Sequence, residues 1–296
     1  MTSTLGRDAM EDQHELMSKG ESDWQIYHLE GKALEVFIAE NWNRITTINL
    51  MMAHQLKAAL RGLTQFSQGS ERHSRALEHL GIYTGDNLDT NMLAQWLWLA
   101  PKDLGLSVNV VPADSTFCTA GSWNWATCAL ERFEFVQCSL STASLESVFK
   151  LLSRISSLKQ LILMMDITDG DTVDSRDATE ALVAVLDHNP RLQKICFDGF
   201  LPEKTLLCQM LKNNQSLESL YLSDLSQKDH KGYFKDVALI LENQNFALKD
   251  FRYNNFPCFQ LRRVEWGPSS VEYFTALNRF GRLKIRKDPF NGETFV

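Results

Sequence analysis

The sequence predicts an α/β solenoid: a curved horseshoe of repeated strand–helix units, with parallel strands on the concave face and helices on the convex face. A short apolar pattern recurs along the chain, and the segments between its copies have the periodicity of amphipathic helices. The chain has 296 residues, 44% of them apolar and 23% charged, which is enough for one extended array of ordinary composition.

The recurring pattern is apolar, two residues, apolar, one residue, apolar. Its last two apolar residues lie on the same face of a strand, because side chains alternate along a strand. Copies start about 25 to 34 residues apart, and one wider gap holds a degraded copy around Leu104 and Leu106. We therefore expect about 7 to 9 irregular repeats. The copies are Ile45-Ile48-Leu50, Leu77-Leu80-Ile82, Leu130-Phe133-Phe135, Leu158-Leu161-Leu163, Leu192-Ile195-Phe197, Leu217-Leu220-Leu222 and Leu248-Phe251-Tyr253, with a terminal copy expected at Phe280-Leu283-Ile285.

Between the copies, apolar residues recur at helical spacing. One such face is Ala178, Leu182, Val185 and Leu186, and another is Val148, Leu151, Leu152 and Ile155. Strands that are separated by helices must run parallel, because the chain returns to the same end each time. A doubly wound α/β domain also alternates strands and helices, but the nearly identical short strand motifs favour the solenoid.

The ends of the chain differ from the repeats. Residues 1–22 are acidic and poor in apolar side chains, so we expect a disordered tail there. Residues 23–296 form the predicted repeat domain, with an N-terminal cap at 23–44 and a C-terminal cap at about 260–296. Within it, the stretch 104–129 has little helical pattern and predicts an irregular or bulged unit.

The repeats resemble the leucine-rich repeats of the ribonuclease-inhibitor type. The strand motif L-x-x-L-x-L carries the resemblance, together with a return that contains Asn three residues before the next Leu, as at Asn189, Asn214 and Asn245. The segment VEYFTALNRFGRLKI is similar to the closing segment of leucine-rich-repeat proteins that are numerous in diatoms. The chain departs from the family at the eighth position of the motif, where Asn or Cys is usual. Only Cys138 fits there, and the other copies have Asp166, Phe200, Leu225 and Phe256.

Composition and motifs exclude several classes of function. The net charge of −7 argues against nucleic acid and anionic membranes as partners. The N-terminus has no apolar core typical of a secretory signal, so we expect a cytoplasmic protein. We also expect the protein to be a monomer. The six cysteines form no CxxC pair, and no catalytic or phosphate-binding motif is present, so we expect no cofactor, no metal and no enzyme activity. The acidic stretch 166–177 could bind calcium, but it lacks EF-hand spacing and fits a solvated loop better.

A solenoid of this kind suggests a protein-binding scaffold or adaptor. Side chains between the apolar strand positions would line the concave face, and large shallow surfaces suit protein partners. The alternative is a regulator of a small GTPase, by analogy with activating proteins built on the same repeats. The residues expected to contact a partner are Tyr83, Arg132, Glu134, Gln160, Met164, Lys194, Tyr221, Asp250 and Arg252.

Overall fold

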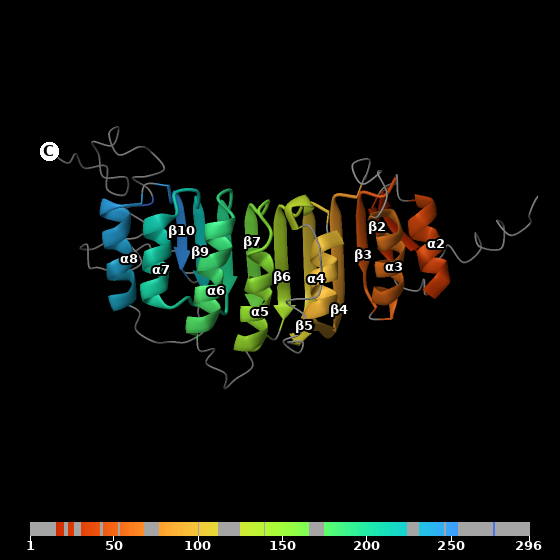
Figure 1. Ribbon diagram of the computed structural model, residues 1–296, viewed down its shortest axis with the longest axis horizontal. Helices are drawn as coiled ribbons and strands as arrows, with labels where there is room; N and C mark the ends of the chain where they lie inside the picture. The colour runs from red at the N-terminus through yellow and green to blue at the C-terminus, as the bar shows by residue number, and fades with distance from the viewer. Residues whose placement is uncertain are drawn as a thin grey trace, which may run out of the picture. The chain divides into compact units, whose positions relative to one another are not determined.

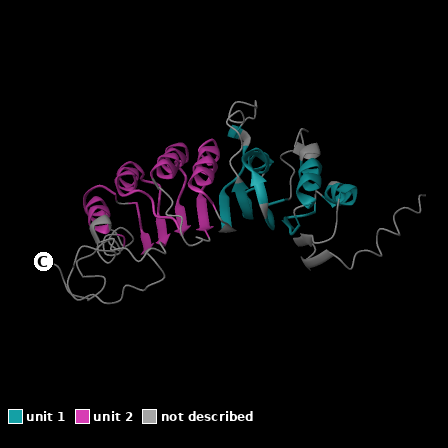
Figure 2. Ribbon diagram, turned by 90° about the horizontal axis from the view of Figure 1, so that it is seen from below, with its two compact units in different colours: residues 1–138 teal, residues 139–296 magenta. Residues whose placement is uncertain are grey.

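The computed structural model describes residues 16–20, 23–26, 31–41, 44–52, 54–67, 77–99, 101–111, 125–138, 140–165, 175–223, 231–245, 247–253 and 275. The chain forms two compact units, Met1–Cys138 and Ser139–Val296 (Figure 2). Strands and helices alternate along both units (Figure 1). The chain is therefore an α/β protein, as the sequence predicts.

Unit 1 has its strands side by side in chain order. Strand β1 pairs antiparallel with β2, and from β2 to β6 each strand pairs in parallel with the next. Helix α3 packs against both α2 and α4. The elements are β1 Leu16–Gly20, β2 Asp23–Ile26, α2 Gly31–Asn41, β3 Thr47–Leu50, α3 Gln55–Ser67, β4 His79–Asp89, α4 Thr90–Leu99, β5 Asp103–Val111, η4 Trp125–Thr127 and β6 Arg132–Cys138.

Unit 2 repeats the same plan. Strands β7 to β10 are neighbours in chain order, and helices α5 to α8 each pack against the next. The pairs β7–β8, β8–β9 and β9–β10 are all parallel. The elements are α5 Thr142–Leu152, β7 Gln160–Met165, α6 Ser175–His188, β8 Lys194–Asp198, α7 Lys204–Asn213, β9 Ser219–Ser223, α8 Lys231–Asn243 and β10 Asp250–Tyr253.

The strand order separates this fold from a doubly wound domain. A doubly wound sheet reverses its strand order and carries helices on both faces. Here the order within each unit never reverses, so right-handed crossovers return each helix to the same side of the sheet. Figure 2 shows the helices of each unit on one side of its strands. We call the opposite side of each unit's sheet the open face.

The predicted apolar triplets are in register within each unit, and they lie in the core. In unit 1, Ile48, Leu80, Leu104 and Phe133 are successive partners across β3 to β6, and in unit 2 Leu161, Ile195, Leu220 and Phe251 are partners across β7 to β10. All eight are buried. The degraded copy at Leu104 and Leu106 is confirmed as a full strand. The expected copy at 280–285 lies outside the described residues.

The helices bury the faces that the sequence predicts. Leu182 and Val185 of α6 and Val148 of α5 are fully buried against the strands. The position usually held by Asn or Cys in the motif is occupied in one repeat by Phe200. Its ring lies 5.4 Å from that of Phe197 and 6.1 Å from that of Phe149, measured between centroids. An aromatic cluster therefore replaces the expected turn side chain in this repeat.

Two expectations about order need correction. The predicted disordered tail contains strand β1, because the backbone of 16–20 pairs with β2 whatever the polarity of its side chains. The expected irregular or bulged unit at 104–129 begins with a strand to Val111, since Leu106, Val108 and Val110 alternate and are buried. The irregularity is found in the pairing of this strand with β4, whose register shifts between Tyr83 and Asn87. Residues 1–15 and 112–124 lie outside the described residues, as does all of the expected C-terminal cap except Thr275.

Asparagines at the helix-to-strand turns of unit 2 connect neighbouring repeats. Asn189 is fully buried; its amide donates to Val185 O at 2.8 Å, and its Oδ1 accepts from Leu158 N, one repeat earlier, at 3.1 Å. Asn245 is also fully buried, and its Nδ2 donates to Leu211 O at 2.6 Å and to Asn214 O at 2.9 Å, again one repeat earlier. These amides satisfy backbone groups that would otherwise be buried without partners.

We predict that Asn189→Ala lowers the free energy of unfolding by about 2 to 4 kcal/mol, because it leaves a buried N–H and a buried carbonyl without partners. The matched control is Asn243→Ala. Asn243 makes a similar bond to Leu239 O at 2.9 Å but is exposed, so a change below about 0.5 kcal/mol is expected. Urea unfolding of the full chain measures both. Equal losses for the two variants would contradict the role of the buried bridge.

Candidate functional site

The open face of unit 1 carries a row of polar side chains on three adjacent strands. His79 of β4, Asp103 of β5 and Arg132 of β6 are register partners, so their side chains project from neighbouring positions. The row exists because each residue immediately precedes a buried apolar strand position. Side chains alternate along a strand, so these residues point away from the helices.

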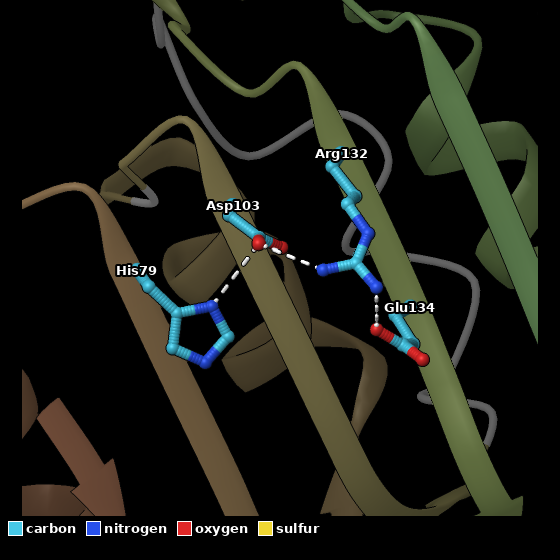
Figure 3. Close-up of polar contacts among 4 residues, drawn as sticks. All are labelled: His79, Asp103, Arg132 and Glu134. Carbon is cyan, nitrogen blue, oxygen red and sulfur yellow. Dashed lines mark hydrogen bonds and ion pairs between the residues drawn. The ribbon is translucent and has the colours of Figure 1, made fainter. Parts of the chain in front are cut away.

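These residues form an ion-pair network with Glu134, two positions further along β6 (Figure 3). His79 Nδ1 lies 3.2 Å from Asp103 Oδ2, and Arg132 Nη1 donates to the same oxygen at 2.9 Å. Arg132 Nη2 donates to Glu134 Oε2. We call His79, Asp103, Arg132 and Glu134 the polar cluster. One guanidinium thus bridges two carboxylates, which fixes its orientation.

The environment of the polar cluster shifts the pKa values of Asp103 and Arg132. Burial alone would raise the pKa of Asp103, but hydrogen bonds from His79 and Arg132 outweigh it and hold this pKa below its usual value. Burial would lower the pKa of Arg132, and the bond to Asp103 outweighs it, so the guanidinium stays charged. In the polar cluster, the two carboxylates outnumber the one guanidinium.

Tyr83 lies across two glycines at the centre of this face. Gly81 and Gly105 are register partners on β4 and β5. A Cβ on Gly105 would lie 2.7 Å from Tyr83 Oη, and one on Gly81 would lie 2.4 Å from Tyr83 Cε2 and 2.2 Å from Asn49 Oδ1. The ring therefore occupies space that side chains at these positions would fill. Burial raises the pKa of Tyr83, and the carboxylates of Glu134 and Asp103 raise it further.

Two acceptor oxygens beside the glycines lack donors. Asn49 Oδ1 and Asp103 Oδ1 are both buried and have no hydrogen-bond partner in the described part of the chain. Asn49 is the register partner of Gly81 on the β3 side, and Glu134 is the partner of Gly105 on the β6 side. Oxygen atoms that could accept hydrogen bonds thus border the two glycines from both flanks.

The open face of unit 2 is of mixed character. Its side chains form rows, one of which runs Ile162, Cys196, Tyr221 and Arg252 across β7 to β10. Met164 is 39% exposed, and the Arg252 side chain is 71% exposed with its Nη2 3.6 Å from Asp250 Oδ2. Burial raises the pKa of Tyr221. This face therefore offers apolar, aromatic and charged groups on one rigid sheet.

The sequence-predicted contact residues all lie on strands and at open-face positions. The structure brings Arg132 together with Glu134, and Asp250 together with Arg252. Gln160 and Lys194 are register partners on β7 and β8, and Tyr83, Met164 and Tyr221 lie on β4, β7 and β9. Their contact with a partner stays a prediction.

His79 and Asp103 are the members of the polar cluster that are absent from the predicted contact residues, and a signal for Asp103 existed. The degraded copy at Leu104 and Leu106 places Asp103 at the same motif position as His79 and Arg132. Listing the outward residues of that copy would have identified it.

The described residues also include the groups that could take part in metal and thiol chemistry. Among them, no group of three or more His, Cys, Asp or Glu side chains is placed to hold a metal ion. Cys128, Cys196 and Cys208 are not in disulfide bonds, and burial raises the pKa of Cys208 to about 11, so its thiol is protonated at neutral pH. Of the acidic stretch 166–177, residues 166–174 lie outside the described part, and Asp177 is in the first turn of α6. No described helix is long and apolar enough to cross a membrane.

Comparison with known proteins adds no assignment: no family model matches the chain, and no curated protein matches it significantly.

We predict that Arg132→Met destabilises the protein by about 1 kcal/mol at pH 7, where partial exposure screens the ion pairs. Asp103 has a lowered pKa in the folded state, so its pairing stabilises the fold above its unfolded pKa of about 3.9 and is lost as pH falls further. The difference between variant and wild type should therefore shrink towards pH 3. Thermal unfolding at both pH values tests this, with the exposed Arg191→Met as control. A pH-independent difference would argue against the pairing.

We also predict that Gly81→Ala costs about 1 to 3 kcal/mol, because both Asn49 and the Tyr83 ring must move. Gly105→Ala should be nearly neutral. Its Cβ meets only the hydroxyl end of Tyr83 at less than 3 Å, and the loss of backbone freedom in the unfolded chain offsets that strain. Chemical unfolding of the two variants side by side measures the difference. Equal effects would show that Tyr83 does not rest on Gly81 as described.

Proposed function

We propose that this chain is a leucine-rich-repeat protein of the ribonuclease-inhibitor type that acts as a non-enzymatic protein-binding scaffold or adaptor. It would present the open faces of its sheets to a partner protein. The observation that carries the proposal is the repeated placement of polar and aromatic side chains on the face opposite the helices, over a core of triplets in register.

The physical basis is preorganisation. Strands fixed by neighbours on both sides hold their side chains at the spacing between strands, about 4.8 Å, before any partner arrives. Little ordering entropy is then lost on association. Tyr and Arg side chains such as Tyr221 and Arg252 combine contact area with hydrogen bonding, which makes such residues frequent binding anchors.

The alternative function is regulation of a small GTPase. It is suggested only by analogy with activating proteins that are built on the same repeats. Nothing in the described side chains favours it over general protein binding. A GTPase assay with and without the protein distinguishes the two.

A pair of charge reversals in unit 2 tests the proposal. Lys194 on β8 and Lys212 on α7 are both exposed, but they lie on opposite layers of the same unit. We expect Lys194→Glu to weaken capture of partners from native cell extract at least about fivefold, and Lys212→Glu to leave it unchanged. Quantitative mass spectrometry of the captured proteins measures both, after circular dichroism has shown equal folding. Equal capture by wild type and both variants would contradict binding through the open face.

A further inference from the structure

We propose that the open face of unit 1 binds a cationic side chain, the guanidinium or ammonium group of a basic segment in the partner protein, over Gly81 and Gly105. This inference rests on the proposed protein-binding function and specifies the chemistry of the partner. It follows from the balance of donors and acceptors, the local charge and the space above the two glycines.

Acceptors exceed donors on this face. Asn49 Oδ1 and Asp103 Oδ1 are buried without a hydrogen-bond partner in the described part of the chain. Buried acceptors are rarely left unsatisfied in proteins, and those that are call for an explanation. Arg132 donates to Asp103 Oδ2 and to Glu134 Oε2, and neither bond reaches Asp103 Oδ1 or Asn49 Oδ1. The group that this face lacks is an N–H donor from outside.

The charge of the face selects the same ligand. Asp103 and Glu134 lie on adjacent strands, and these two carboxylates share a single guanidinium, that of Arg132. An incoming carboxylate or phosphate would face both carboxylates at close range, with the guanidinium already bonded to them. A cation is attracted instead, and the partial burial of these groups strengthens that attraction relative to bulk water.

The space over Gly81 and Gly105 is taken by the ring of Tyr83, with Asn49 Oδ1 beside it, and this is the position that the cation would occupy. As register partners, the two glycines remove the side chains from the centre of the face, and Asn49 and Glu134 flank them. The Tyr83 ring now covers both glycines, and its hydroxyl oxygen lies over Gly105. Rotation of this one side chain uncovers the backbone and the acceptor oxygens. It also offers the face of an aromatic ring, on which a guanidinium stacks favourably.

The test uses a fluorescein-labelled glycine–serine peptide that contains two arginines, and the same peptide with neutral citrulline in their place. Fluorescence anisotropy at low salt measures the affinity of the full chain for each. We expect the arginine peptide to bind at least about tenfold more tightly than the citrulline peptide, which is the effect of one charge-assisted hydrogen bond. Glu134→Gln should weaken it by a similar factor. The matched control is Glu40→Gln on helix α2 of the same unit, which removes the same charge from the helix layer and should leave affinity within about twofold.

Asn49→Leu separates a binding role from a structural one. The proposal predicts that this variant raises the Tm, because a buried unsatisfied oxygen is removed, and at the same time weakens the arginine peptide about fivefold. A lower Tm, an unchanged affinity, or equal weakening by Glu40→Gln and Glu134→Gln would each overturn the inference. If the chain binds the arginine and citrulline peptides equally but Lys194→Glu still weakens partner capture, the cationic site is wrong and the scaffold function stands. If the peptides bind equally and Lys194→Glu leaves capture unchanged, both proposals fail.

Discussion

The structure of each unit depends on one constraint, the burial of apolar triplets in register between a strand and the helix behind it. A strand of four or five residues has too little surface to be stable alone. It becomes stable when its second and third apolar residues lie beside those of both neighbours, as Ile195 does between Leu161 and Leu220. A slip of one residue would turn every triplet to the open face, so the apolar pattern fixes the register. The polar face follows from the same rule, because every residue between buried positions must point outwards.

Most of this fold could be predicted from the sequence, because the information is local and repeated. Each triplet carries its own alternation, and each intervening helix its own apolar face, so an error in one repeat does not spread to the next. Phe200 illustrates where the repeat pattern gives way to packing: a residue outside the family pattern is accommodated because two other aromatic rings surround it. Strand β1 could not be predicted, since its stability comes from backbone pairing with β2 and not from a side-chain pattern.

The candidate site was predictable in part. Arg132 and Glu134 could be placed on the open face from alternation alone, and their mutual contact follows from their spacing of two residues on one strand. The link to Asp103 and His79 required the register between strands, which the degraded repeat obscured. The role of Gly81 and Gly105 was also beyond sequence reasoning, because a glycine in a strand reads as a defect until the side chain that covers it is known. Here that side chain is Tyr83, which comes from the same strand as Gly81.

The buried asparagines of unit 2 have a consequence for how this part of the chain comes apart. Asn189 and Asn245 each hold a backbone group of the preceding repeat, so neighbouring repeats share hydrogen bonds as well as apolar contacts. In a linear array of repeats, the interface free energies between neighbouring repeats determine how many repeats unfold together. The Leu158 amide hydrogen should therefore exchange with deuterated solvent when the repeat that contains Asn189 opens, even while its own strand remains paired. The exchange rate of the Leu158 amide would then measure how often the following repeat, which contains Asn189, opens.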